Sequence, residues 1–427
     1  MDAATAPRSN PWVVLATLLV IYIFNFADRY LLTGLIGPIK QEFEIGDGMI
    51  GLLMGPAFVV LYVVMGVPFA RLADRGSRIR IIAAGCVLWS LATAATGLAT
   101  GPISLALARI GVGVGEAAFV APAYSLLTDY FKPERRGLAF AILGLATYFG
   151  QIAGQAGGPA LAAEIGWRST FFAVGLPGVA LGFIALLLVR EPPRVLAAGV
   201  QAVAEIPIGK LIGLLLRSPG YVMMALGFGL GTLSGVTFGF WGPELFTRNF
   251  DLDPVTVKTA FALNFGLAGL CGMLAFGALS DKLTQRGRVW PVRLSGLALL
   301  CATALVLVAV WAPSFELAML VAIPCGLLGG GWSVGIYAGL QHMLPASYRA
   351  SATALFIAFI TLLGYFVGPW ATGAISQSLG DDAASLQTAI SVVVPAGFLA
   401  GLFALLAAGR VETDREMLAG QETERAA

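Results

Sequence analysis

Four ionisable side chains interrupt stretches of sequence that are otherwise apolar. Asp28 and Arg29 lie in the first of these stretches, and Arg109 and Glu116 lie in the fourth. An ionised group at membrane depth is costly, so it usually faces a partner or a water-filled cavity. A carboxylate whose arginine partner changes between two conformations binds a proton with a different affinity in each. We therefore expect Asp28 and Glu116 to respond to protons, with Arg29 and Arg109 as their switching partners.

Helical geometry limits how these residues can pair. Arg109 and Glu116 are two helical turns apart and share one face. Asp28 and Arg29 are adjacent and point about 100° apart, so they need separate partners. The sequence leaves open whether Asp28 pairs with Arg109. It also leaves open two other roles: Arg29 can grip an anionic headgroup through two guanidinium nitrogens, or the charges can form a static buried salt bridge.

The composition indicates a polytopic membrane protein. Of 427 residues, 58% are hydrophobic and only 12% are charged, and the mean hydropathy is +0.85. Charged residues make up about a quarter of a typical soluble domain. The net charge of +2 gives no sign of nucleic-acid binding. The four cysteines lie in apolar runs and the single histidine is His342, so we expect no metal site and no cofactor.

Apolar stretches of about 20 residues predict membrane-spanning helices. Twelve such stretches lie near residues 12–37, 49–70, 79–99, 103–127, 137–161, 167–189, 219–243, 256–279, 290–311, 315–340, 350–376 and 384–408. They predict six-helix bundles over 1–189 and 219–409, with a linker at 190–218 and a tail at 410–427. The apolar centre of the linker, from Ile206 to Leu216, is too short to span and fits an amphipathic helix at the interface. The polar start, Met1 to Asn10, does not resemble a cleaved signal peptide.

The basic residues predict the orientation of these spans. If the N-terminus is cytoplasmic, 20 lysines and arginines fall inside, 4 fall outside and 2 lie within spans. The four on the outside are Lys40, Arg168, Arg248 and Lys258. Because cytoplasmic loops carry an excess of positive charge, both termini and the linker are predicted to be cytoplasmic.

The two halves of the chain repeat each other. Asp74, Arg75 and Arg78 follow the second span, and Asp281 and Arg288 follow the eighth. Two parallel repeats of six spans are typical of a large transporter fold that holds its substrate near the membrane midplane between the halves. We expect these loops to be cytoplasmic gates, in which each aspartate lies at a helix N-terminus and pairs with arginines. Binding to anionic lipid is the alternative role.

These features resemble the major facilitator superfamily over essentially the whole chain. The loops at Asp74 and Asp281 match its signature, although Ala70 stands where a glycine is usual and Gly76-Ser77 is reversed. The stretches Asn25–Tyr30 and Arg109–Ala117 resemble the Spinster-like branch. The resemblance implies an all-α membrane protein with twelve transmembrane helices in the major facilitator fold of two six-helix bundles. It also implies transport of lysophospholipids or sphingoid phosphates.

Polar and aromatic residues in several spans are candidates for the substrate cavity. A wide and mostly apolar wall suits an acyl chain better than a sugar, although each of these residues could equally face lipid or a neighbouring helix. The candidates are Asn25, Tyr30, Phe238, Trp241, Asn264, Trp332, Tyr337 and Tyr365. Glycines such as Gly113, Gly115, Gly150 and Gly154 are interpreted mainly as sites of close helix packing.

We therefore expect a secondary transporter, not an enzyme, that moves an amphipathic anionic lipid by alternating access and is coupled to protons. The expected partners are this lipid, protons and membrane lipids, without nucleic acid, for a monomer in the cell membrane. Transport of soluble organic anions or drug export by the same fold is the alternative. A non-transporting receptor or a membrane-embedded enzyme is a remote alternative, because the sequence has no nucleotide-binding loop and no nucleophile–base arrangement.

Overall fold

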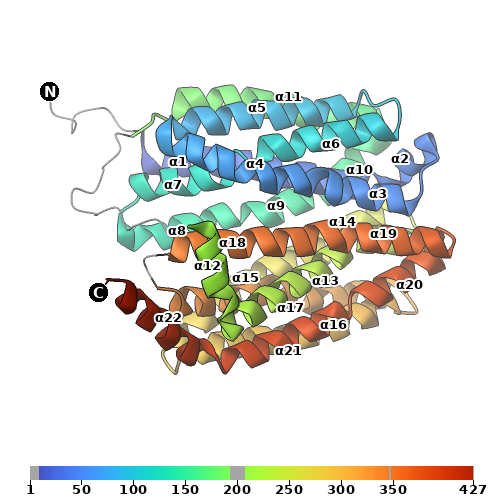
Figure 1. Cartoon of the computed structure of the whole chain (residues 1–427). Coiled ribbons are helices and arrows are strands. Elements are labelled where there is room, and N and C mark those ends of the chain that lie inside the picture. Colours follow the sequence, from blue (N-terminus) through green and yellow to red (C-terminus); the bar gives the residue numbers. More distant parts are fainter. Residues whose placement is uncertain (1–8, 193–206, 346–347, 427) are drawn as a thin grey trace. The chain divides into compact units, whose positions relative to one another are not determined.

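The protein is built from helices throughout the part of the chain that the computed structural model describes, residues 9–192, 207–345 and 348–426 (Figure 1). Twelve helical segments within those ranges are long and apolar enough to cross a membrane. This confirms the predicted number of spans and the all-α class. The spans cover Pro11–Gly34, Asp47–Arg75, Arg78–Thr96, Pro102–Tyr130, Glu134–Ile165, Trp167–Leu188, Pro219–Phe250, Pro254–Thr284, Val289–Val310, Phe315–Met343, Ser351–Leu379 and Ala383–Ala408.

Several spans contain short breaks or π-helical turns, so the structure has more elements than spans. In chain order the elements are α1 (Pro11–Gly34), α2 (Ile36–Phe43), α3 (Asp47–Met54), α4 (Pro56–Arg75), α5 (Arg78–Thr96), α6 (Pro102–Glu116), α7 (Val120–Tyr130), α8 (Pro133–Gly144), α9 (Ala146–Ile152), η1 (Ala153–Gly157), α10 (Gly158–Ile165), α11 (Trp167–Leu188), α12 (Ile208–Leu216), α13 (Pro219–Phe250), α14 (Pro254–Phe261), η2 (Ala262–Leu267), α15 (Ala268–Thr284), α16 (Val289–Val310), α17 (Phe315–Met343), α18 (Arg349–Thr361), η3 (Leu362–Val367), α19 (Gly368–Leu379), α20 (Ala383–Val393), α21 (Ala396–Ala408) and α22 (Val411–Ala426). Here η marks a π-helical turn.

Side-chain caps fix where many of these helices begin. Ser77, Ser218 and Ser314 accept hydrogen bonds from backbone N–H groups in the first turns of α5, α13 and α17. Asp253 and Asp382 do the same for α14 and α20. Such caps satisfy amides that have no partner within the helix. The hydrogen bonds from Thr256 hold the pKa of Asp253 below its ordinary value, and those from Ser385 do the same for Asp382.

The chain forms two compact units. Among the described residues, the first comprises 9–192 with 252–262, and the second comprises 207–251 with 263–345 and 348–426. The short helix α14 thus belongs with the first unit, whereas the sequence assigns it to the second bundle. Lys258 of α14 is 1% exposed and donates a hydrogen bond to the carbonyl oxygen of Gly34 at 2.9 Å.

Glycines let the helices of the first unit approach closely around the charged residues. A Cβ atom on Gly113 of α6 would lie 2.3 Å from the carbonyl oxygen of Phe58 in α4. A Cβ atom on Gly150 of α9 would lie 2.4 Å from the Cβ of Phe26 in α1. Because no side chain fits at either position, these glycines bring α4 and α9 against the helices that carry the charges.

Two elements outside the twelve spans pack into the second unit. The short helix α12 buries Leu211, Leu214 and Leu215 in the same hydrophobic core that contains Val411 and Leu418 of the C-terminal helix α22. The predicted linker helix is therefore present, although Ile206, at its expected start, lies outside the described residues. The tail is also helical over most of its length.

Candidate functional site

The four charged residues of the first and fourth spans gather in the first unit. Asp28 and Arg29 lie on α1, and Arg109 and Glu116 lie on α6. Asp28 and Arg109 are each 2% exposed, Glu116 is 0% exposed, and the side chain of Arg29 is 10% exposed. We call these residues the charged cluster. Two positive and two negative groups are thus buried together, which is tolerable only because each has an opposite charge nearby.

The charges pair crosswise between the two helices. The Nε atom of Arg29 donates a hydrogen bond to Oε2 of Glu116 at 2.6 Å, and its Nη2 atom lies 2.6 Å from the same oxygen. Nη1 of Arg109 lies 3.6 Å from Oδ2 of Asp28, an ion pair without a hydrogen bond. The adjacent residues Asp28 and Arg29 therefore take separate partners, as their angular separation predicts.

The carboxylates of Asp28 and Glu116 differ in the hydrogen bonds that they accept. Neither carboxylate oxygen of Asp28 accepts a hydrogen bond from the described part of the chain, and Oε1 of Glu116 also has no donor there. The hydroxyl of Thr93, near Asp28, donates instead to the carbonyl oxygen of Trp89. A buried carboxylate without hydrogen bonds is unfavourable unless it binds a proton, water or a ligand. Of the two acids, Asp28 therefore has the surroundings that stabilise an ionised carboxylate less.

Aromatic rings surround the arginines of the cluster. The guanidinium carbon of Arg29 lies 4.7 Å from the ring centroid of Phe58, 5.0 Å from that of Tyr62 and 5.1 Å from that of Phe26. Phe58 also lies 5.4 Å from the guanidinium carbon of Arg109. Cations are attracted to the faces of such rings. Sequence reasoning missed Phe58 and Tyr62, although their spacing of one helical turn on α4 is a signal for a shared face.

The predicted cavity residues of the first unit lie beside the cluster. Asn25 is 1% exposed, and its Oδ1 atom has no hydrogen-bond partner among the described residues. Tyr30 is 9% exposed, and its Cβ lies 2.8 Å from where a Cβ on Gly154 would be. Asn25 is thus a polar group close to Asp28 along α1, whereas Tyr30 packs against the π-helical turn η1.

The predicted cavity residues of the second unit lie in several places. Phe238 and Trp241 of α13 are fully buried, and the indole N–H of Trp241 donates to the carbonyl oxygen of Pro369 at 3.1 Å. Trp332 and Tyr337 each lie 4.7 Å, centroid to centroid, from the ring of Phe228.

The other two candidates lie in π-helical turns. Asn264 lies in η2 and Tyr365 in η3, and both are partly exposed. The ring centroids of Tyr365 and Phe240 lie 6.2 Å apart. Trp241, Trp332 and Tyr337 thus contact other residues of the second unit, and their place in the substrate cavity stays a prediction.

The first gate loop differs from the expectation for its aspartate. Asp74 lies in the last turn of α4, not at a helix N-terminus, and is exposed, as is Arg75. The helix extends to Arg75, and Gly76, which caps it, is the first residue with a non-helical backbone. The prediction for Asp74 was wrong in this respect.

Arg78 is the anchored residue of this loop. It is 4% exposed, and its Nε donates to Oε1 of Glu191 at 2.7 Å while its Nη1 donates to Oδ2 of Asp129 at 2.5 Å. Glu191 also accepts a hydrogen bond from the backbone N–H of Ile79 at the start of α5. The anion at the helix N-terminus is therefore Glu191, which sequence reasoning missed because it follows Arg78 by 113 residues.

In the second gate loop the aspartate also lies at the end of a helix and not at its start. Asp281 lies in the last turn of α15 and is exposed, so the prediction of a position at a helix N-terminus was wrong here too. Arg288 precedes α16, and its Nη1 lies 3.3 Å from Oε1 of Glu412 in α22. Both halves thus place a basic residue of the loop against an acid that is distant in sequence.

The described residues contain no group of three or more histidine, cysteine, aspartate or glutamate side chains that could hold a metal ion. The chemistry available to the charged cluster is therefore that of its own groups: proton exchange at the two acids and binding of an anion at the two arginines.

Comparisons with known proteins agree with this architecture. The model of the Major Facilitator Superfamily matches residues 18–283 and 224–426. An MFS-type efflux pump of Mycolicibacterium smegmatis is 31% identical over 426 residues, which cover 97% of each chain. Protein spinster homolog 1 of Homo sapiens is 28% identical over 438 residues, covering 94% of this chain and 81% of the human protein.

A solved structure is similar along nearly the full length. It is the crystal structure of a bacterial homologue of the human lysosomal transporter Spinster, in an inward-facing and unoccupied conformation. The TM-score is 0.86 at 25% identity, and the match covers 96% of this chain and 99% of that chain.

Proposed function

The chain belongs to the Major Facilitator Superfamily, in its Spinster-like branch, and on this premise we propose that it is a proton-coupled transporter of an amphipathic anionic lipid. Members of this superfamily are transporters, not enzymes. The proposed substrate is a lysophospholipid or a sphingoid phosphate, moved by alternating access. The proposed location is the cell membrane, with both termini in the cytoplasm.

Glu116 and Asp28 differ in how closely an arginine binds them, and this difference is the observation that supports proton coupling. Glu116 is held by Arg29 at 2.6 Å, whereas Asp28 has only the looser contact to Arg109 at 3.6 Å. A proton on Asp28 would neutralise this carboxylate and free Arg109 to take another anionic partner. Movement of α1 against α6 would change both ion pairs together. Proton binding and helix movement are thereby linked in one set of contacts.

The arginines of the cluster support an anionic headgroup. Both have planar guanidinium groups that bind phosphate oxygens in pairs. The aromatic rings of Phe26, Phe58 and Tyr62 leave little water around Arg29, and hydrogen bonds strengthen where water is excluded. The resemblance of the span 1 and span 4 sequences to the Spinster-like branch supports the lipid class.

Flux into proteoliposomes tests this proposal. We expect uptake of a fluorescent lysophospholipid by the wild-type protein to depend on an imposed pH gradient. Asp28→Asn and Glu116→Gln should reduce this dependence, because the acid can no longer exchange a proton. Glu164→Gln, at an exposed acid that belongs neither to the charged cluster nor to the gate loops, is the matched control and should retain it. Unchanged pH dependence in both cluster variants would contradict proton coupling at these residues.

The similarity to an efflux pump favours a second candidate function, export of drugs or soluble organic anions. The same proteoliposomes distinguish the two. A lipid transporter should be inhibited by lysophospholipids but not by free glycerol phosphate, because the acyl chain contributes to binding. Efflux of a soluble dye that lysophospholipids do not inhibit would favour the exporter.

A further inference from the structure

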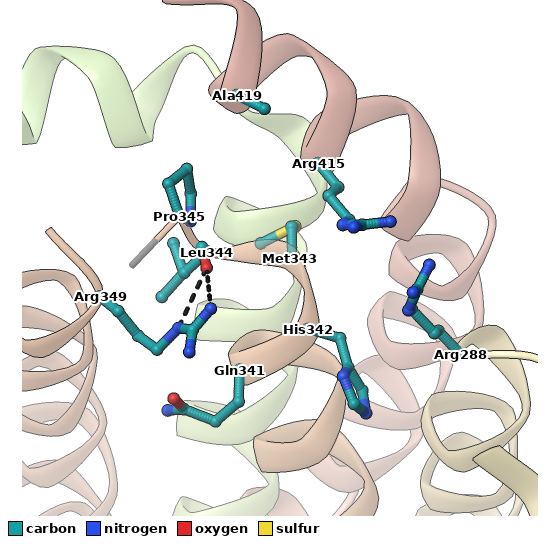
Figure 2. A pocket seen from close by; sticks show the side chains of 9 residues that line it. All are labelled: Arg288, Gln341, His342, Met343, Leu344, Pro345, Arg349, Arg415 and Ala419. Carbon is teal, nitrogen blue, oxygen red and sulfur yellow. Dashed lines mark hydrogen bonds between the residues drawn. The ribbon is translucent and has the colours of Figure 1, made fainter. Parts of the chain in front are cut away.

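A basic pocket lies in the second unit, away from the charged cluster, at the end of α17. Its volume is about 480 Å³. Figure 2 shows three arginines and a histidine around it, with Arg349 on one side and Arg288 on the other. The lining residues are Arg288, Gln341, His342, Met343, Leu344, Pro345, Arg349, Arg415 and Ala419. We call this the basic pocket.

The basic pocket has a surplus of positive charge. Arg288, Arg349 and Arg415 are opposed in the described part of the chain by one contacting acid, Glu412, which lies 3.3 Å from Arg288 and 3.6 Å from Arg415. Three guanidinium groups and one carboxylate leave two positive charges even when His342 is neutral. Arginine side chains gathered around a cavity favour an anion as its occupant.

The walls of the basic pocket are held in place by buried contacts. Oδ2 of Asp414, a residue 3% exposed, accepts hydrogen bonds from the hydroxyl of Ser218 and the N–H of Gly220, both at 2.6 Å. These contacts dock α22 on the start of α13 and thereby position Arg415. A rigid surround reduces the cost of binding because fewer groups need to be ordered.

Arg349 is also fixed in orientation. Its Nε and Nη2 atoms donate to the carbonyl oxygen of Leu344 at 3.1 and 2.8 Å (Figure 2). The carboxyl end of a helix carries partial negative charge, which disfavours an anion. Here the capping carbonyl of α17 is already bound by a guanidinium group. Arg349 also lines the basic pocket.

The position of the basic pocket indicates what kind of anion it holds. The apolar span Phe315–Met343 ends at the pocket, so the arginines lie at the level expected for lipid headgroups. Met343, Leu344, Pro345 and Ala419 add apolar surface beside the charges. The volume falls within the range of about 300–1,000 Å³ for small-molecule sites. A phosphate ester with a small organic part fits both the charge and the size.

We propose that the basic pocket is a binding site for a phosphate ester, separate from the transport site, and that Arg288, Arg349 and Arg415 bind the phosphate. Basic pockets between membrane helices are known as sites for anionic lipid headgroups. The same chemistry would accept a soluble phosphate ester. The test therefore separates these two sources.

The test uses the full-length purified protein in neutral detergent. Native mass spectrometry measures binding of phosphatidylglycerol, with phosphatidylcholine, which is zwitterionic and has no net charge, as the comparison. Thermal unfolding measures stabilisation by the same lipid and, separately, by glycerol phosphate. We expect Arg288→Gln/Arg415→Gln to weaken binding of the phosphate-bearing probe by about tenfold or more, because charge-assisted contacts from two guanidinium groups are lost.

Two further variants make the result specific. Arg217→Gln/Arg410→Gln removes the same charge from exposed arginines of the second unit that do not line the basic pocket, and should bind within about twofold of wild type. Arg288→Lys/Arg415→Lys keeps the charge and should bind with intermediate strength. Unfolding without added probe and gel filtration show whether each variant is folded.

The outcomes divide clearly. Stabilisation by phosphatidylglycerol that only the pocket variants lose supports a lipid headgroup site. Stabilisation by glycerol phosphate alone, lost in the same variants, supports a soluble phosphate ester. Equal loss in the pocket and control pairs, or no effect of either probe on the wild type, overturns the proposal.

Discussion

At the scale of single residues, the charged cluster combines one tight and one loose ion pair. Glu116 is fully buried and bound by two nitrogens of Arg29, so breaking this pair is expensive. Asp28 has an ion pair at 3.6 Å and no hydrogen bond from the described residues. The sequence predicts that Asp28 and Arg29 need separate partners. It could not predict which arginine each acid takes, because this depends on the rotation of α1 against α6.

The tight pair can be tested for its structural and functional roles together. Arg29→Gln leaves Glu116 buried without its partner and should lower the free energy of unfolding by about 3 kcal/mol. Arg29→Gln/Glu116→Gln removes both charges and should restore most of this stability. Transport should remain low in both variants if the pair has a role in coupling. Thermal unfolding and flux measure the two effects, and recovery of transport in the double variant would show a purely structural pair.

An exposed glutamate gives a pH-dependent contribution to stability. Glu42 of α2 accepts hydrogen bonds from Arg168 and from the indole N–H of Trp167, and these hold its pKa below the ordinary value of 4.5. Because the pKa is lower in the folded protein, this stabilisation is complete above about pH 4.5 and is lost as the pH falls through the folded value.

We therefore expect Glu42→Gln to lose less stability than the wild type between about pH 5 and pH 3. The side chain is 43% exposed, so solvent screening keeps the difference below about 1 kcal/mol. Unfolding temperatures measured across this range provide the check. Glu164→Gln, another exposed acid, controls for the loss of one charge, and it should follow the wild-type curve.

At the scale of helices, close approach at glycine positions the aromatic rings of the cluster. Gly113 lets α6 contact the backbone of α4 at Phe58, and the ring of Phe58 then lies against both arginines. The sequence predicts that these glycines are packing sites. It could not identify the neighbour, since small residues in a membrane helix do not specify which helix approaches.

Substitution of Gly113 tests this positioning. In Gly113→Ala the new Cβ would lie 2.3 Å from the carbonyl oxygen of Phe58, so α4 and α6 must separate, at a cost of about 1–3 kcal/mol. Transport should fall as Phe58 moves away from Arg29 and Arg109. In Gly66→Ala of α4 the Cβ meets no atom within 4 Å, so stability should be unchanged or higher by up to about 1 kcal/mol. Equal unfolding temperatures for the two variants would contradict the close approach.

At the scale of the whole molecule, hydropathy predicts the number of spans and the all-helical class. The twelve spans and the short helix α12 follow from periods and lengths that are local in the sequence. Contacts between distant segments could not be predicted in this way. Glu191 binds Arg78 across 113 residues, and α14 packs with the first unit although it follows the seventh span.

The orientation in the membrane is a prediction at this scale and can be tested directly. The excess of arginine and lysine in one set of loops predicts that Gln285 faces the cytoplasm and Glu164 faces the opposite side. Both residues are exposed at helix ends. Single cysteines at these positions, in a background with Cys271 and Cys301 replaced, can be labelled with a membrane-impermeant maleimide.

In intact cells, we expect Glu164→Cys to be labelled and Gln285→Cys to be protected until the membrane is permeabilised. Cys86 and Cys325 are buried, so they should react slowly in both single-cysteine variants. The reverse labelling pattern would indicate the opposite orientation of the protein in the membrane. It would place the basic pocket and the loop at Arg78 outside the cell, where the excess of positive charge would contradict the rule from which the orientation is derived.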